Sequence, residues 1–351
     1  MIIVRAPVRV SFGGGGTDLA AYYERFGGLV ISAAITRYCQ VVVNERTDQR
    51  ISISSGDYHI WESYSLDSLP PLQQPLALPK AVVSWFVSQG ALKTGIDLFL
   101  SSEVPPGTGL GSSSAMAVAL VHALSALAGR VLEPLELADL ACHVEIDLLQ
   151  MPIGKQDQYA SAVGGLNTIE FTRQEVSVTP LSLSPHIVSS LNRRLLLFTI
   201  GQSRNSADIL EQQRADTKKQ PKTIDVLHRM KSLAVEMQQA LLSDELDYFG
   251  ELLDKGWQEK KSLSAKVSSQ LIDQCYAAAR QAGALGGKIT GAGGGGFLLL
   301  YCPLRAQKEV RTALIQLGLR EMMFDIDLTG AQIASSNWQD AAHLSHSLST
   351  S

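Results

Sequence analysis

Residues 105–115 combine glycines and serines in a pattern that suits anion binding. Their sequence is PPGTGLGSSSA, and it stands directly before a long run of helix-forming residues. Glycine allows the backbone to approach a ligand closely, and the first N–H groups of a helix have no partner within the helix. Because the helix dipole also favours negative charge there, the pattern predicts a phosphate site. A tight turn with a serine N-cap is the alternative that these residues leave open.

Two further glycine runs flank this segment along the chain. Residues 13–16 are four glycines followed by Thr17 and Asp18, and residues 286–297 read GGKITGAGGGGF. Five of the six residues 291–296 are glycine. This density is entropically unfavourable unless the backbone needs positive φ or a close approach. We therefore favour a ligand-contacting loop over a flexible hairpin turn.

The common nucleotide-binding loops do not explain residues 105–115. The segment matches neither GxxxxGK[ST] nor GxGxxG, and two prolines precede its glycines. A GxGxxG unit would also need a strand before it, a helix after it and an acidic residue about 20 positions further on. An NAD-dependent enzyme is therefore disfavoured.

Composition narrows the class of protein. The chain has 351 residues, of which 45% are hydrophobic and 18% charged, a length that favours two domains over one. A net charge of -4 and a pI near 6.0 argue against nucleic acid or an anionic membrane surface as partner, and favour a small molecule. No signal peptide or membrane span is predicted, and the four cysteines lack metal-ligand or redox spacing. A cytoplasmic protein with reduced thiols is expected.

The pattern of apolar residues predicts an α+β fold in two parts. Strands are expected at 2–12, 29–35, 40–44, 95–101 and 297–302, and helices at 80–89, 112–129, 134–149 and 270–284. Residues from about 181 read as a connector and a new strand, followed by long polar helices. We predict one domain at 1–180, a second at 181–345 with helices on one face of an antiparallel sheet, and a disordered tail at 346–351.

Taken in order, the three glycine segments resemble one family, the GHMP kinases, which include galactokinase, homoserine kinase, mevalonate kinase and phosphomevalonate kinase. PPGTGLGSSSA is similar to the phosphate loop of that family, APVRVSFGGGGTD to its N-terminal substrate motif and KITGAGGGGF to its C-terminal glycine motif. The resemblance spans about 290 of the 351 residues. It implies an N-terminal part like domain 2 of ribosomal protein S5 with a left-handed βαβ crossover, a ferredoxin-like C-terminal part, and an active site between them.

The same resemblance implies that ATP and Mg²⁺ bind at the phosphate loop. The residues expected to contact ATP are Pro106, Gly107, Gly109, Leu110, Gly111, Ser112, Ser113 and Ser114. Ser113 matches the family position that ligates magnesium, and Glu145 matches its acidic partner. Oxygen ligands of this kind suit Mg²⁺. A solvated helix charge is the alternative for Glu145, because Asp147 lies beside it.

The segment PIGKQDQY resembles the catalytic loop of the galactokinase type, which implies that Asp157 is catalytic. A carboxylate there can accept the proton of the acceptor hydroxyl as the phosphoryl group is transferred. Arg9 matches the arginine of the family's APxR motif and is the cation expected beside Asp157. Without the resemblance, an N-cap role for Asp157 is equally reasonable.

The substrate motif departs from galactokinases, which have Glu-His where this chain has Gly15 and Gly16. Asp18 matches the residue that hydrogen-bonds sugar hydroxyls. Thr17, Gly293 and Gly294 complete the residues expected around the substrate.

The strings GGGGTDL, KQDQYASAVGGLN and GQSRNSADIL resemble a bacterial branch of the family, the D-glycero-D-manno-heptose 7-phosphate kinases. That branch implies a sugar phosphate as partner and a cationic pocket for its phosphate, for which Arg204 is the candidate, with Ser203 and Ser206 adding hydroxyl donors. A solvated Arg204 at a helix N-terminus is the alternative. A kinase for another sugar, such as a hexose or uronic acid, and a catalytically dead ligand sensor also stay open, as does the oligomeric state.

Overall fold

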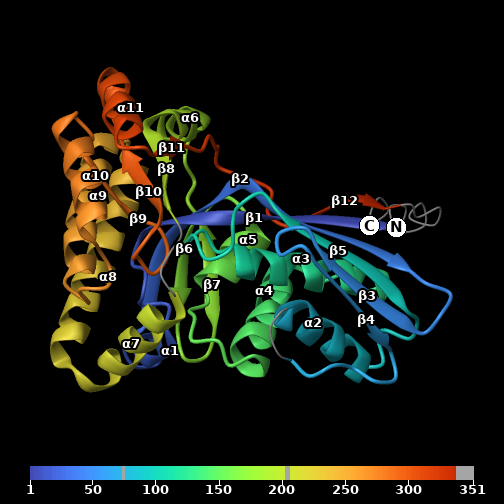
Figure 1. Ribbon diagram of the computed structural model, residues 1–351. Helices are drawn as coiled ribbons and strands as arrows, with labels where there is room; N and C mark the ends of the chain where they lie inside the picture. Colours follow the sequence, from blue (N-terminus) through green and yellow to red (C-terminus); the bar gives the residue numbers. More distant parts are fainter. Residues whose placement is uncertain (73–75, 202–205, 337–351) are drawn as a thin grey trace, which may run out of the picture.

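A computed structural model describes residues 1–72, 76–201 and 206–336 (Figure 1). The chain folds into two sheets with helices packed against them. Among the helices of these residues, none combines the length and apolar character that crossing a bilayer requires. The mixed content of helix and strand confirms the predicted α+β class.

The larger sheet has eight strands and is centred on β1 (Ile2–Gly13). Its main path runs in the order β12-β1-β2-β5-β3-β4, and β6 and β7 extend it from the other end of β2. All pairings are antiparallel except β3 with β5. The remaining bounds are β2 (Gly28–Glu45), β3 (Arg50–Ser55), β4 (Ile60–Ser65), β5 (Ile96–Ser102), β6 (Leu166–Phe171), β7 (Val176–Pro180) and β12 (Gln332–Ser336).

Strand β2 differs from its prediction as two strands at 29–35 and 40–44. It is continuous because its two halves have different partners: residues 28–33 pair with β6, and residues 39–45 pair with β5. The polar stretch at 36–38 lies where β2 passes from one partner to the other. The polar residues there do not end the strand, since its pairing with β1 runs on both sides of them.

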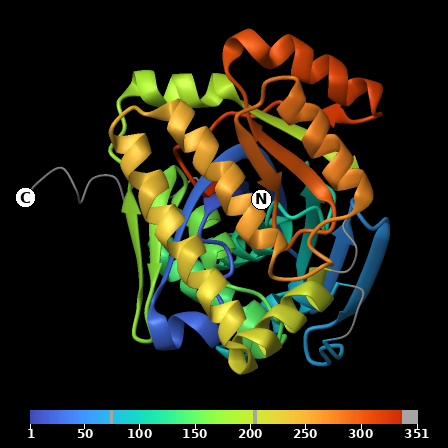
Figure 2. The same ribbon diagram turned by 90° about the vertical axis from the view of Figure 1, so that its left-hand side faces the viewer.

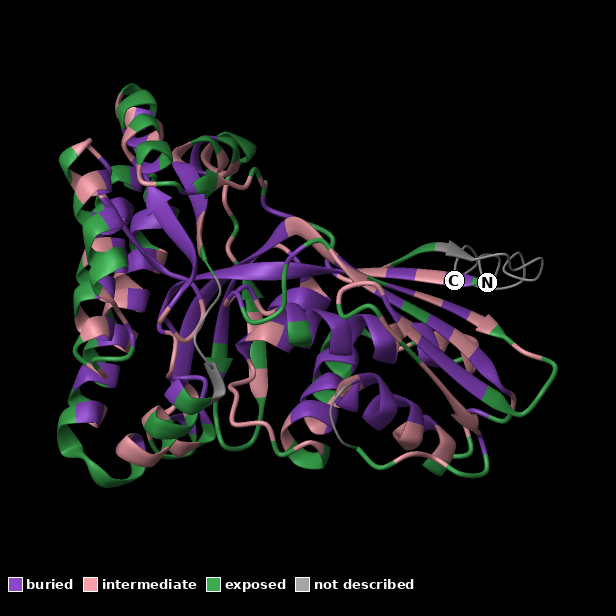
Figure 3. Ribbon diagram, viewed as in Figure 1, coloured by how far each residue is buried: buried purple, intermediate pink, exposed green. Residues whose placement is uncertain are grey.

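Helix α3 (Ser112–Leu127) is the central helix of the larger sheet and packs directly on β1 and β2. It is apolar on nearly all sides because other helices cover the rest of it (Figures 1 and 3). These helices are α2 (Ala77–Ser88), α4 (Pro134–Cys142) and α5 (Gln156–Val163). The helix predicted at 134–149 is confirmed, but its last part, His143–Leu148, is a π-helical turn. Such turns are rare in proteins as a whole, and those that occur are often found at functional sites.

The smaller sheet has four antiparallel strands in the order β11-β8-β10-β9. These are β8 (Leu195–Gly201), β9 (Gly286–Ile289), β10 (Gly296–Tyr301) and β11 (Arg320–Glu321). Alternate residues of β8 and β10 belong to two different cores, so this sheet is buried on both faces.

Helices cover the smaller sheet and reach the larger one, and Figure 2 shows the gold and orange helices of this part facing the viewer. Helix α10 (Gln270–Gln281) packs with α11 (Gln307–Gln316), while α9 (Leu246–Lys261) packs on β9. Helix α8 (Pro221–Leu242) contacts β1 and β2 of the larger sheet. The remaining helices are α1 (Ala20–Phe26), α6 (Pro185–Arg194) and α7 (Ser206–Lys219).

The segment expected as a connector before β8 is instead helix α6. Ser184 caps this helix by accepting a hydrogen bond from the N–H of Ile187, and Pro185 occupies its first position. These two start signals outweighed the loop-like composition. The chain passes from the larger sheet to the smaller one after β7, close to the predicted boundary at 180. Strand β12, however, returns to the larger sheet and pairs with β1. The limits 1–180 and 181–345 stay a prediction.

The phosphate loop and the C-terminal glycine loop touch where the two parts meet. Thr290 donates its hydroxyl to the carbonyl oxygen of Thr108 at 3.1 Å. Gly109 has φ +78°, and a Cβ placed there would lie 2.6 Å from the carbonyl oxygen of Thr290. Glycine is required here by both positive φ and close approach. This contact brings segments about 180 residues apart to one site.

Candidate active site

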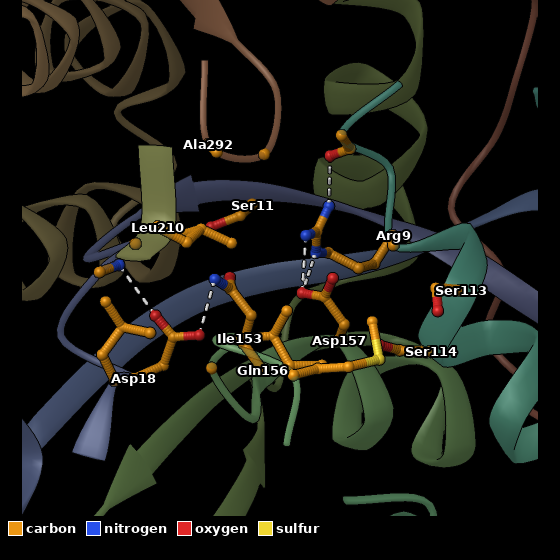
Figure 4. Close-up of a pocket in the computed structure, with 18 of the residues that line it drawn as sticks. Arg9, Ser11, Asp18, Ser113, Ser114, Ile153, Gln156, Asp157, Leu210 and Ala292 are labelled. Carbon is orange, nitrogen blue, oxygen red and sulfur yellow. Dashed lines mark hydrogen bonds and ion pairs between the residues drawn. The ribbon is translucent and has the colours of Figure 1, made fainter. Parts of the chain in front are cut away.

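One pocket contains most of the residues singled out from the sequence (Figure 4). It is lined from β1, the turn after β1, the phosphate loop, α3, α5, α7, α9 and β9. The predicted residues that line it are Arg9, Gly15, Gly16, Asp18, Gly107, Gly109, Gly111, Ser112, Ser113, Ser114, Glu145 and Asp157. The fold thus gathers them from positions 9 to 157.

The phosphate loop leads directly into the N-terminus of α3. The N-cap position is Gly111, with φ +76° and no side-chain cap, so the serine N-cap is not what the structure contains. Ser112 and Ser114 are largely buried, while Ser113 is exposed in the pocket. The first N–H groups of the helix have no helical partner and lie at the pocket. This arrangement suits the phosphates of a nucleotide.

Arg9 connects the phosphate loop to Asp157. Its guanidinium donates to Asp157 Oδ1 at 2.8 Å from Nε and lies 2.6 Å away at Nη2, while Nη1 donates to the carbonyl oxygen of Gly109 at 2.8 Å. A Cβ on Gly111 would lie 2.9 Å from Asp157 Oδ2, so the carboxylate sits directly against the loop. Asp157 is in the first turn of α5, whose N-cap is Lys155. The geometry is that of an oriented carboxylate beside the N-terminus of α3.

Glu145 is fully buried, which excludes the alternative of a solvated helix charge. Its oxygens accept from Ser113 Oγ at 2.7 Å and from Gln158 Nε2 at 2.6 Å. Burial raises the pKa of Glu145 to about 7, because these neutral partners offset only part of the desolvation. Asp147, by contrast, is exposed and pairs with His143 at 2.9 Å.

The pair formed by Glu145 and Ser113 fits a magnesium ion. A buried carboxylate without a cationic partner is stabilised by a bound cation, and Mg²⁺ is usually held by one or two carboxylates together with phosphate oxygens. Across the described residues there is no cluster of three or more acidic, histidine or cysteine side chains placed for a metal. A cation here would therefore depend on phosphate oxygens for its other ligands.

Asp18 occupies the opposite side of the pocket from Ser113 (Figure 4). It accepts from the N–H of Gly16 at 2.8 Å and from Gln156 Nε2 at 3.0 Å. Burial, followed by the charge of Asp157, raises the pKa of Asp18. A carboxylate held in this way can accept hydrogen bonds from ligand hydroxyls.

Several predicted residues do not line this pocket. Thr17 is buried and bonds the carbonyl oxygens of Gly14 and Leu29, which shapes the turn. Leu110 is in the core. Gly293 and Gly294 pack against residues 266–267, and Ala292 lines the pocket in their place. Arg204 and Ser203 lie outside the described residues, and nothing is described of the side chain of Ser206.

The pocket residues that were not identified from the sequence include four long polar side chains, Gln156, Gln213, Lys260 and Lys288. Lys288 lies within GGKITGAGGGGF, so its place in a glycine motif could have indicated it. Lys260 ends a polar helix and belongs to no motif. Both lysines are more than nine-tenths buried.

A second cavity adjoins the first and shares Gly107, Ser112, Ser113 and Met151 with it. Its walls are mainly apolar, and its polar residues include Asp57, Tyr58, Ser55 and Ser102. Pro106, predicted as an ATP contact, lines this cavity. Apolar walls with a few polar groups are typical of small-molecule sites, and a base could bind here while its phosphates reach α3.

Comparisons with known proteins agree with the resemblance of the motifs. The family described as "GHMP kinases N terminal domain" matches residues 77–165, and "GHMP kinases C terminal" matches residues 237–318. The chain is 31% identical to a D-glycero-alpha-D-manno-heptose 7-phosphate kinase of Campylobacter jejuni over 302 residues, 86% of this chain and 89% of that protein. The chain therefore belongs to the GHMP kinase family.

It is an ATP-dependent sugar kinase of the GHMP type. A crystal structure of a D-glycero-D-manno-heptose 1-phosphate kinase from Bacteroides thetaiotaomicron has a TM-score of 0.80 and 29% identity, covering 95% of this chain and 98% of that one. The chain is also 30% identical over 335 residues to a bifunctional fucokinase/GDP-fucose pyrophosphorylase of Arabidopsis thaliana, covering 89% of this chain and 31% of that protein. The predicted family and fold are confirmed.

Gly154→Ala should weaken acceptor binding, because a Cβ at this position would overlap the carboxylate of Asp18. Losing hydrogen bonds to a charged group costs about 1.5–3 kcal/mol, so KM for the acceptor should rise roughly 10- to 100-fold. KM for MgATP should stay unchanged. The matched control is Gly256→Ala on α9, where the new methyl meets only Met237 Cε at 3.5 Å. An unaltered KM for the acceptor would show that Asp18 does not contribute to acceptor binding.

Asp157→Asn should lower turnover by roughly 10²-fold or more, the usual contribution of a positioned acid or base. An amide oxygen can still accept from Arg9, so KM for both substrates should change little. The measurement is steady-state ADP release. Asp147→Asn serves as control, because that exposed carboxylate lies on the preceding helical segment, away from the pocket. If the variant kept a turnover close to that of the wild type, Asp157 would not be the catalytic base.

Proposed function

We propose that this kinase phosphorylates the anomeric hydroxyl of D-glycero-D-manno-heptose 7-phosphate and forms the 1,7-bisphosphate. The observation that supports this most is the placement of Asp157 between the N-terminus of α3 and Asp18 (Figure 4). ATP phosphates would lie on the α3 side, and sugar hydroxyls on the Asp18 side. The anomeric hydroxyl would then point to Asp157. The relative from C. jejuni, named for this substrate, supports the choice of sugar.

In the proposed reaction the hydroxyl oxygen attacks the γ-phosphorus of ATP, the bond to the β-phosphate oxygen breaks, and ADP leaves. Asp157 accepts the proton of the hydroxyl, and Arg9 holds its carboxylate in position through two contacts. The N-terminus of α3 orients the phosphates, and the apolar cavity beside it would hold the adenosine. Charge neutralisation on the phosphates is the chemistry that Mg²⁺ supplies when bound, with Ser113 and Glu145 as its protein ligands.

A related sugar is the second candidate, because the fucokinase similarity covers nearly the whole chain. The same pocket would serve, and the difference would lie in the groups around Asp18. The sensor hypothesis is disfavoured, since Arg9 contacts Asp157 and Glu145 contacts Ser113. A protein that no longer performs the reaction has no need to keep both pairs oriented.

Ser113→Ala should raise the Mg²⁺ concentration needed for half-maximal activity, because one oxygen ligand is lost while the helix N-terminus remains. A titration of activity against Mg²⁺ at fixed ATP measures this. Ser125→Ala, near the other end of α3, removes a serine hydroxyl that does not line the pocket and should leave the Mg²⁺ dependence as in the wild type. An identical dependence in both variants would contradict the proposed ligand.

The substrate itself is tested with a panel of sugars and sugar phosphates in an ADP-release assay. Heptose 7-phosphate should be used most efficiently, and ³¹P NMR should show a new anomeric phosphate beside the original one. Unphosphorylated hexoses should be poor acceptors. If galactose or fucose outperformed the heptose phosphate, the proposed acceptor would be wrong, although the chain would still be a sugar kinase of this family.

A further inference from the structure

Two buried lysines in the pocket have no part in the reaction described above. Lys260 is at the end of α9 and is 6% exposed, and Lys288 is in the middle of β9 and is 5% exposed. Lysine is rarely buried to this extent unless it is paired. Lys260 donates to the carbonyl oxygen of Gly291, and no ion pair joins either lysine to any described carboxylate. The two ammonium groups therefore bring positive charge into the site without a direct ion pair to any described carboxylate.

The direction of Lys288 follows from the pairing of its strand. It lies opposite Leu299 of β10, and opposed residues of an antiparallel pair point to the same face. Leu299 belongs to the core shared with the larger sheet, whereas the neighbouring Ile289 belongs to the second core. Lys288 consequently faces the pocket between the two sheets. A solvated lysine protecting an edge strand would instead be exposed.

The other charges in the pocket are already engaged. Arg9 is committed to Asp157 and Gly109, Glu145 to Ser113 and Gln158, and Asp18 to Gly16 and Gln156. Burial and the charge of Arg9 lower the pKa of Lys260 to about 8, and burial, Lys260 and Arg9 lower that of Lys288 well below its usual value. A bound anion would relieve both the repulsion and the desolvation.

The neighbours of the two lysines include residues on the Asp18 side of the pocket. Figure 4 shows Asp18 and Ala292 on one side of the pair formed by Arg9 and Asp157, with Ser113 and Ser114 on the other. Lys260 bonds Gly291, the residue before Ala292, and Asp18 is the carboxylate whose charge raises the pKa of both lysines. ATP phosphates have a separate site at α3. A second anion near Asp18 would thus belong to the acceptor.

We propose that Lys260 and Lys288 form an anion subsite that binds the phosphate already carried by the acceptor sugar. This inference rests on the proposed function and adds the residues that select a phosphorylated sugar over a free one. Lys288 contributes an ammonium group that no other described residue engages, and Lys260 holds the C-terminal glycine loop while sharing the anion. Two ammonium groups would balance the charge of a sugar phosphate, which is about -2 at neutral pH.

The main test compares Lys288→Met and Lys260→Met with Lys255→Met, an exposed lysine on α9 that controls for the change in charge. We expect kcat/KM for heptose 7-phosphate to fall roughly 10- to 100-fold in the first two variants, because each variant loses charge-assisted hydrogen bonds to the phosphate. In Lys288→Met, which breaks no hydrogen bond to the glycine loop, values for unphosphorylated D-glycero-D-manno-heptose and KM for MgATP should match the control. Equal losses for both sugars, or a raised KM for MgATP, would overturn the proposal.

Methionine is similar in length and removes a buried charge, so these variants should melt at or above the wild-type temperature. If one fails to fold, the wild-type protein provides a second measurement. Inorganic phosphate should inhibit competitively against heptose 7-phosphate and not against MgATP. Inhibition competitive only with MgATP would assign the anion to the nucleotide side and refute the subsite.

Failure of the proposed function can be told apart from failure of this inference. If the panel identifies a different sugar phosphate as the best acceptor, the variants are tested with that compound, and the same loss is expected. If the best acceptor carries no phosphate, the proposed function is wrong. In that case, inorganic phosphate is titrated directly into the ATP-free wild type and into Lys288→Met, and the two affinities are compared. If phosphate binds both proteins equally well, the proposed subsite is wrong as well.

Discussion

The buried guanidinium of Arg9 is the interaction on which the arrangement of the site depends. It contacts the Asp157 carboxylate through Nε and Nη2 and the carbonyl oxygen of Gly109 through Nη1, while its backbone N–H donates to Leu110. One residue of β1 thereby holds both the phosphate loop and the start of α5. Removing it would leave a partly buried carboxylate without its cation, which is strongly unfavourable. The donor site and the carboxylate proposed as the base are therefore positioned together.

The glycines keep this unit compact. Gly109 and Gly291 touch backbone to backbone, and Gly111 and Gly154 lie against Asp157 and Asp18 respectively. A side chain at any of these four positions would separate segments that line the same pocket. Their number in the sequence reflects close approach between segments more than flexibility, because each is enclosed by backbone or by a carboxylate.

Charge is divided across the pocket in a way that would suit ATP and the phosphorylated acceptor proposed above. The α3 side has a helix N-terminus and a buried carboxylate suited to a cation, and two buried lysines elsewhere in the pocket form no ion pair with any carboxylate of the described residues. This division explains why the site can hold several carboxylates and several cations without pairing all of them. The groups left unpaired are those expected to meet ligand charges.

Local sequence was enough to predict the family, the α+β class and half of the residues that line the pocket. The glycine motifs, the APVR segment and QDQY can be recognised from local sequence alone. Each of these segments is expected to need one particular backbone shape, whichever elements of the fold pack around it. Helix α3 and strands β1, β5 and β10 follow from apolar patterns that are equally local. Elements defined by their partners were missed, such as the continuity of β2 and the pairing of β12 with β1.

The same distinction holds for side chains. Glu145 is buried because the π-helical turn directs it to Ser113 and Gln158, and no neighbour in sequence indicates this. Lys260 enters the pocket because α9 packs on β9, and Lys288 faces the pocket because of its register with Leu299. Motifs record which residue types the chemistry needs. Burial, pairing and charge balance depend on contacts between segments far apart in the chain, and these arise only when the two sheets come together.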